Sequence, residues 1–126
     1  MRKDLVIIPD DQPGVLARLG ATLGAAGINI EAISAFTGQG KGIVHLLVDK
    51  ADEALEVLAE AGVEVSAARR VAVKSLPNEP GALGDACAKL AEAEINIQQA
   101  YIAAESKLVI VCDDVDAAKR VLEITE

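Results

Sequence analysis

Aromatic residues are almost absent from this sequence, since Phe36 and Tyr101 are the only two and there is no tryptophan. A surface that binds nucleic acid by stacking aromatic rings on bases is therefore nearly excluded. Basic residues are also few, with 12 Lys+Arg against 20 Asp+Glu and a formal net charge of −8. This balance argues against a large phosphate-binding face, so we expect no nucleic-acid partner.

Long apolar segments are missing too. The longest runs, such as Leu5 to Pro9, are far shorter than the roughly 20 residues of a transmembrane helix. The first residues lack the apolar region and cleavage site of a signal peptide, so we expect a cytoplasmic protein with no membrane partner. Cys87 and Cys112 show no CxxC spacing. Buried free thiols are the simpler interpretation, and a disulfide or metal pair is the alternative.

The residues that are abundant are Ala, Val, Leu and Ile, which must build the core because 52% of the chain is hydrophobic. The 126 residues suit one ordinary domain or two very small ones. An internal repeat decides between one domain and two. The segment DQPGVLARL from Asp11 aligns with NEPGALGDA from Asn78, and GINIEAI from Gly27 aligns with EINIQQA from Glu94. The matched residues are 67 positions apart, as Pro80 minus Pro13 shows. We therefore predict two copies of one unit, at residues 1–68 and 69–126.

Each copy predicts the order strand, turn, helix, strand, hairpin, strand, helix. The first copy is expected to contain strands at 5–8, 28–37, 43–48 and from 63, a helix bearing Leu16, Leu19 and Leu23 that ends at Gly27, and a helix capped by Asp52 that ends at Gly62. The second copy is expected to contain strands at 71–76, 95–102 and 108–112, a helix bearing Leu83, Ala86, Cys87 and Leu90, and a helix bearing Ala118, Val121 and Leu122. Its fourth strand is missing. Residues 63–76 contain no turn residue, so one strand is expected to lead directly into the next.

A βαββαβ unit forms an antiparallel sheet with both helices on one face. The predicted fold is therefore α+β, with two ferredoxin-like units in tandem, the second lacking its last strand. Residues 5–8 and 108–111 are apolar on both strand faces, which predicts that both faces are covered. Together with the missing strand, this pattern predicts a homodimer or a larger even assembly.

Three other patterns are better explained by structure than by chemistry. The glycines at 38, 40 and 42 precede a strand, so they indicate a hairpin tip rather than a phosphate loop. His45 has no nucleophile nearby in sequence, so we expect a surface or interface histidine and no catalytic residue. The acidic side chains of one predicted helix indicate its solvated face rather than a metal site: Asp49, Asp52, Glu53, Glu56 and Glu60.

The repeated D/N-x-P-G turn is the candidate site. It joins a strand to a helix start, where unpaired N–H groups and the helix dipole can hold a carboxylate. Gly14 and Gly81 would let a ligand approach the backbone closely. Asn29 and Asn96 follow their helices at the same spacing and could supply amide groups. Alternatively, the residues that open each turn serve only in turns and caps.

At these residues the sequence resembles the ACT domain, the amino-acid-sensing module of aspartate kinase, phosphoglycerate dehydrogenase and the acetolactate synthase small subunit. In that family amino acids bind between paired units, at the first strand–helix loop and the following strand. The resemblance implies ligand contacts from Asp11, Gln12, Gly14, Val15, Leu16, Asn29 and Ile30 in the first copy, and from Asn78, Glu79, Gly81, Ala82, Leu83, Asn96 and Ile97 in the second. Serine-binding members carry Asn where Asp11 stands here and a His upstream of the turn, where this chain has Pro9 and Leu76.

The expected function is thus a regulatory protein that binds a free amino acid, uses no cofactor and modulates a partner enzyme or pathway. Three alternatives remain: a ligand-free dimerisation or adaptor module, the regulatory small subunit of an amino-acid biosynthetic enzyme, and a small enzyme. The last has no convincing nucleophile–base pair.

Overall fold

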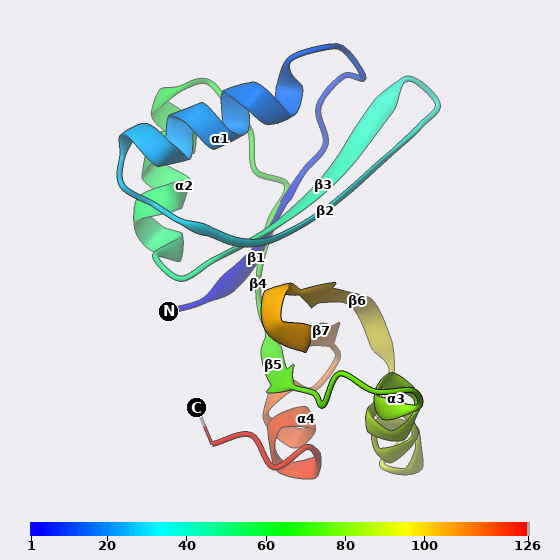
Figure 1. Ribbon diagram of the computed structural model, residues 1–126. Helices are drawn as coiled ribbons and strands as arrows, with labels where there is room; N and C mark the ends of the chain where they lie inside the picture. The colour runs from blue at the N-terminus through cyan, green and yellow to red at the C-terminus, as the bar shows by residue number, and fades with distance from the viewer. Residues whose placement is uncertain (126) are drawn as a thin grey trace. The chain divides into compact units, whose positions relative to one another are not determined.

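The computed structural model describes residues 1–125, and the chain divides into two compact units, Met1–Arg69 and Arg70–Glu126 (Figure 1). Each unit has its own apolar core. We call them unit 1 and unit 2 and describe each by itself.

Unit 1 has the predicted βαββαβ order. Its elements are β1 (Lys3–Ile7), α1 (Val15–Ala25), β2 (Ile30–Gly38), β3 (Lys41–Val48), α2 (Ala51–Glu60) and β4 (Ala67–Arg70). The strands form one sheet in the order β2-β3-β1-β4, and β3 pairs antiparallel with both β1 and β2. The predicted α+β, ferredoxin-like fold is confirmed.

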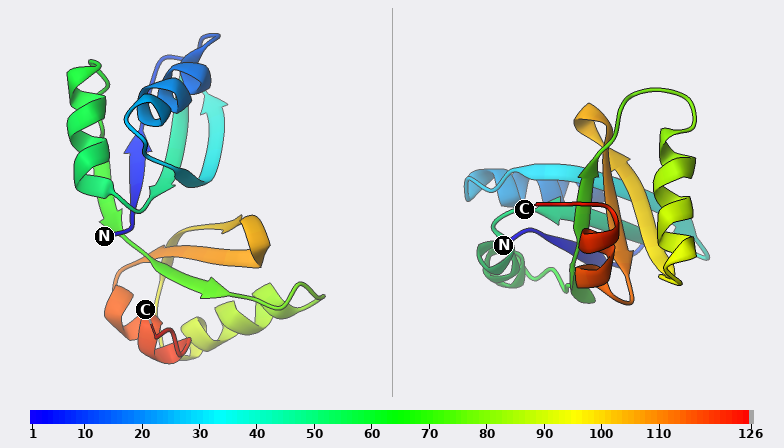
Figure 2. Two further views of the ribbon diagram at one scale, coloured as in Figure 1. Left: turned by 60° about the vertical axis from the view of Figure 1, so that its left-hand side comes forward. Right: turned by 90° about the horizontal axis from the view of Figure 1, so that it is seen from below.

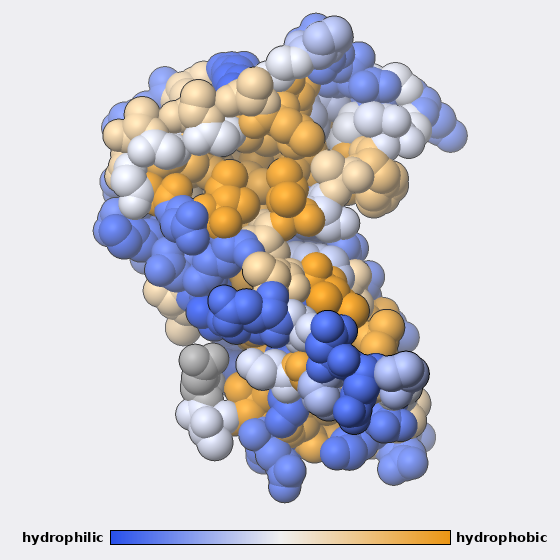
Figure 3. Space-filling view, viewed as in Figure 1, coloured by the Kyte–Doolittle hydropathy of each residue, from blue (hydrophilic) through white to orange (hydrophobic). Residues whose placement is uncertain are grey.

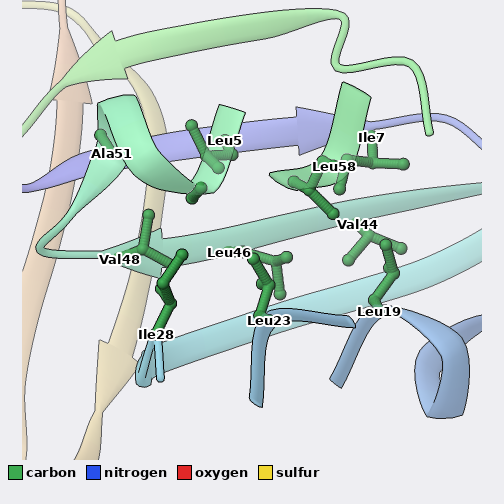
Figure 4. Packing of buried hydrophobic residues seen from close by; sticks show 11 residues of the cluster. Leu5, Ile7, Leu19, Leu23, Ile28, Val44, Leu46, Val48, Ala51 and Leu58 are labelled. Atoms are coloured by element: carbon green, nitrogen blue, oxygen red, sulfur yellow. The ribbon is translucent and has the colours of Figure 1, made fainter. Parts of the chain in front are cut away.

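The core of unit 1 lies between its sheet and its two helices (Figure 4). Alternate β3 residues, Val44, Leu46 and Val48, face Leu19 and Leu23 of α1, because side chains alternate between the two faces of a strand. Leu58 of α2 joins the same cluster. Burying each such side chain stabilises the unit by about 1.5–3 kcal/mol, so both helices are held on one face of the sheet.

Unit 2 repeats this plan with a smaller sheet. Its elements are β5 (Ala72–Ser75), α3 (Ala82–Glu92), β6 (Ile97–Ala103), the short 3₁₀ helix η1 (Ala104–Ser106), β7 (Lys107–Cys112) and α4 (Val115–Val121), and Figure 2 gives two further views of both units. The sheet order is β5-β7-β6, and among the described residues no fourth strand joins it. Only Val71 separates β4 from β5, as the absence of turn residues predicted.

Several predicted turns are confirmed in unit 1. Gly27 has a φ of +73° and ends α1 in a Schellman motif, in which the Ile28 N–H donates to the Leu23 carbonyl at 3.0 Å. Gln39 and Gly40 both have positive φ, which gives a two-residue type I′ turn between β2 and β3. In β2 the pairing with β3 shifts register between Ile30 and Ala32.

Other expectations need correction. The residue at the start of α2 is Lys50, and no side chain caps this helix, so Asp52 lies in the first turn instead. The fourth strand begins at Ala67 rather than Val63, because residues 63–66 are still irregular as the chain returns to the sheet from α2. Cys112 is buried as predicted, whereas Cys87 is only half-buried.

Candidate functional site

The loop between β1 and α1, residues 8–14, is bound to the hairpin tip of β2 and β3 by hydrogen bonds and an ion pair. The Asp11 N–H donates to the Gly40 carbonyl at 2.9 Å, and the Gly42 N–H donates to the Pro9 carbonyl at 2.8 Å. Lys41 forms an ion pair with Asp10, and this lysine lowers the pKa of the Asp10 carboxyl by a hydrogen bond and by its charge. The loop therefore has a defined position before any ligand binds.

The loop ends at an uncapped helix start. Gly14 precedes α1 with φ +92° and ψ −5°, and no side chain caps the helix. The first helical bond runs from the Arg18 N–H to the Gly14 carbonyl at 2.9 Å, so three N–H groups lie ahead of it, those of Val15, Leu16 and Ala17. Such groups and the helix dipole favour an anion.

Helix α4 provides the contrast within the same chain. There the Asp114 carboxylate accepts a hydrogen bond from the Ala117 N–H at 2.9 Å. Because α4 carries its own anion and α1 does not, the start of α1 is the better place for an external carboxylate.

Two pockets share the loop as a common wall. The first, of about 440 Å³, is lined by Asp11 and Thr37 and by the apolar residues Val15, Leu16, Ala17, Ala35, Phe36 and Val44 among others, and we call it the apolar pocket. The second, of about 410 Å³, includes Asp10, Arg18, Lys41 and Glu64 in its lining, and we call it the charged pocket. Gln12, Gly14 and Val15 line both pockets.

Five of the predicted site residues in the first copy thus come together, namely Asp11, Gln12, Gly14, Val15 and Leu16. Asn29 does not join them. It is exposed, lines neither pocket, and follows the far end of α1, a helix of 11 residues and so about 16 Å long. Ile30 packs half-buried against the core of unit 1. A ligand at the loop therefore contacts neither residue of the same unit.

The turn of the second copy repeats the left-handed glycine before the helix, although the Ala82 N–H already donates to the Glu79 carbonyl at 3.3 Å. Gly81 precedes α3 with φ +88° and ψ −12°, no side chain caps the helix, and the Asp85 N–H donates to the Gly81 carbonyl at 2.9 Å. Five predicted residues lie at this turn, namely Asn78, Glu79, Gly81, Ala82 and Leu83. Asn96 is exposed beyond α3, and Ile97 is half-buried against the core of unit 2.

His45 was expected at a surface or an interface, and the surface expectation is wrong. The residue is 8% exposed, and its Nδ1 lies 2.9 Å from Oδ2 of Asp4, which is fully buried. The two side chains share the sheet face opposite the core, because Asp4 pairs with Leu47 in the register of β1 and β3. The pair spans 41 positions, so no local pattern could reveal it.

The sequence reasoning also missed the residues that the fold adds to the loop. Phe36 and Thr37 reach the apolar pocket from β2, and Lys41 reaches the charged pocket from β3. Arg18 donates a hydrogen bond to the Ala61 carbonyl at the end of α2. The spacing of Arg18 from Gly14, one helical turn, could have placed it on the same side of α1.

Unit 1 belongs to the ferredoxin-like class of α+β domains, as its order of elements and its sheet topology show. Within it, residues 5–60 match the ACT domain family model. No curated protein matches the sequence. Among residues 1–125, no helix is long and apolar enough to cross a membrane.

Solved structures resemble the chain over nearly its whole length. Protein BT0572 from Bacteroides thetaiotaomicron is 27% identical, with a TM-score of 0.85 over 96% of this chain and 85% of that one. The regulatory subunit of aspartate kinase from Thermus flavus is 25% identical, with a TM-score of 0.66 over 97% and 89%. The ligand-free regulatory subunit from Thermus thermophilus shows the same fold at 24% identity, with a TM-score of 0.70 over 97% and 89%.

Proposed function

We propose that this protein is a tandem ACT protein, with units at residues 1–68 and 69–126, that binds a free amino acid and thereby regulates a partner enzyme. The observation that carries the proposal is the uncapped start of α1, which faces pockets of about 410 and 440 Å³ within residues that match the ACT domain. The repeated turn in unit 2 supports a second site of the same kind.

The proposed binding is by charge complementarity. The ligand carboxylate meets the N–H groups of Val15 to Ala17, where the helix dipole favours an anion. The exposed carboxylate of Asp11 meets the ligand ammonium, because at contact it would repel the carboxylate by an energy on the order of a few kcal/mol. Since Asn78 stands in place of Asp11 in unit 2, the two sites are inequivalent.

Asn29 and Asn96 belong to the proposal through the family resemblance alone. Both are exposed, so their amides are accessible to a ligand held by the loop of another ACT unit. Replacing either by alanine weakens binding about tenfold or more in this proposal. Stability changes little, because an exposed amide loses no buried hydrogen bond.

Regulation requires that the ligand favours one state of the protein over another. We propose that occupancy changes how the protein contacts its partner enzyme, in keeping with the similar Thermus flavus structure, which is the regulatory subunit of aspartate kinase. An enzymatic role for this chain itself is not proposed, because the His45–Asp4 pair is buried and closed to a substrate.

The test is a thermal-unfolding screen against each of the twenty amino acids. A ligand that binds only the folded state stabilises it by about 2.7 kcal/mol at 100 times its Kd, so at least one amino acid raises the unfolding temperature. Asp11→Asn reduces that shift, more at low salt where charges are less screened, while the control Asp52→Asn on the exposed face of α2 does not. Unchanged melting with all twenty would contradict the proposal and favour the adaptor module.

A further inference from the structure

The two pockets beside the β1–α1 loop differ in chemistry. The charged pocket holds two basic and two acidic side chains, and the Lys41 ammonium and the Asp10 carboxylate in it already pair with each other. The apolar pocket is lined by Asp10 as well, and by Asp11, which forms no ion pair within residues 1–125, beside a wall of aliphatic side chains. An amino acid needs both a polar anchor and a place for its side chain, and the apolar pocket offers both.

The apolar wall includes side chains that the core of unit 1 leaves uncovered. Leu16 is 49% exposed on the first turn of α1, and Phe36 is 57% exposed on β2. Ala35 pairs with Val44 across β2 and β3, so its methyl group lies on the helix side of the sheet. Figure 3 shows hydrophobic surface on unit 1 in this view. Groups of this kind stabilise a bound aliphatic chain by removing it from water.

We infer that the amino acid bound by unit 1 carries an aliphatic side chain, as in valine, leucine or isoleucine, and that Ala35 sets the size of that side chain. The inference rests on the proposed function. With the ligand carboxylate at the start of α1 and its ammonium at Asp11, its side chain is directed to the wall formed by Leu16, Ala17 and Ala35. The apolar side chains of this wall carry no charge that could pair with the charged end of a longer polar side chain.

The second copy supplies a natural comparison for the size of the wall residue. Ile102 occupies in the second copy the position that Ala35 has in the first, 67 residues earlier. Ala35 pairs with Val44 of β3, and Ile102 pairs with Leu108, the equivalent residue of β7. The variant Ala35→Ile therefore introduces into unit 1 a side chain that the same fold accepts in unit 2, where Ile102 is 56% exposed. It narrows the pocket by three carbon atoms without disturbing the core.

Calorimetric titration of the full chain with isoleucine, valine, alanine, serine and lysine tests the inference. Isoleucine and valine are expected to bind at least tenfold more tightly than serine and lysine, because one methylene in an apolar pocket already changes affinity about tenfold. In Ala35→Ile, isoleucine binding falls tenfold or more, whereas alanine binding changes less than threefold. The control Ala68→Ile makes the same change at an exposed position of β4, outside both pockets, and leaves all affinities unchanged.

Two results overturn the inference while leaving the proposed function intact. One is tighter binding of serine or lysine than of isoleucine, and the other is equal loss of alanine and isoleucine binding in Ala35→Ile. A wild-type chain that binds none of the twenty amino acids instead contradicts the proposed function itself.

Discussion

Gly14 and Gly81 hold the backbone in a conformation that other residues rarely adopt. Their φ angles are +92° and +88°, and each residue lies directly before a helix. A Cβ atom built on either would meet no heavy atom within 4 Å, so the requirement for glycine is conformational rather than steric. The open space beside both glycines also permits the close approach of a ligand that the sequence predicts.

Gly14→Ala is therefore expected to destabilise the protein by about 1–2 kcal/mol, the cost of a left-handed conformation for a residue with a Cβ. Urea denaturation measures this. Gly20→Ala is the matched control, because Gly20 lies within α1 with equally open space and negative φ, so alanine stabilises it by about 0.5–1 kcal/mol. Equal effects of the two substitutions would show that the φ of Gly14 is not the reason for its glycine.

Other single residues could not be predicted, for a physical reason. Helical spacing groups Leu16 with Leu19 and Leu23, yet only the last two are buried, and Leu16 is 49% exposed. The same holds for Leu83 in α3. Periodicity gives the direction of a side chain but not what covers it. The partner of His45 is similarly hidden, since it comes from another strand.

At the scale of elements, the two copies differ most in how the hairpin holds the loop. In the first copy, two backbone hydrogen bonds and the Lys41–Asp10 ion pair join the β1–α1 loop to the β2–β3 hairpin. In the second, whose hairpin is three residues shorter, the Leu76 N–H donates to the Ser106 carbonyl, and Glu105 and Pro77 stand where the ion pair would be. The loop of unit 1 is thus the better preorganised for a ligand.

The ion pair makes a prediction about pH. Because Lys41 lowers the pKa of Asp10 below its ordinary 3.8, the pair contributes fully above pH 3.8, and its contribution is lost as the pH falls through the lowered pKa. Following the Asp10 carboxyl carbon by NMR should show this low pKa, which returns toward 3.8 in Lys41→Ala. Asp116 is the control, since Arg70 lowers its pKa independently. An Asp10 pKa that is the same in both proteins would rule out the ion pair.

Element order followed from the repeat, whereas element ends did not. The shared offset of 67 predicted the same turn before both helices, and the structure has a glycine in the left-handed region directly before each of them. The start of β4 was misplaced because residues 63–66 alternate between apolar and polar like a strand. Regular strand pairing begins only at Ala67, and the Ser66 N–H bond to the Val6 carbonyl at 2.7 Å comes just before it. Backbone pairing, rather than local pattern, decides where a strand begins.

For the whole molecule, the sheet edges predict self-association. In unit 1, β2 is an edge strand with Ile33 49% and Phe36 57% exposed, and in unit 2, β5 is an edge strand of a three-stranded sheet. Open edges with apolar side chains pair readily with another chain. We predict a homodimer, with a mass twice 13.0 kDa by light scattering, and weaker association in Ile33→Glu. A stable 13.0 kDa species in dilute solution would contradict this.

Binding at the start of α1 can be observed directly by recording backbone amide NMR spectra while each amino acid is added. The account predicts that a binding amino acid shifts the resonances of Gly14 to Ala17, whereas those of Asp114 to Ala117, where Asp114 already caps α4, stay in place. Amide shifts that avoid residues 14–17 with every amino acid, or an unchanged spectrum throughout, would contradict it.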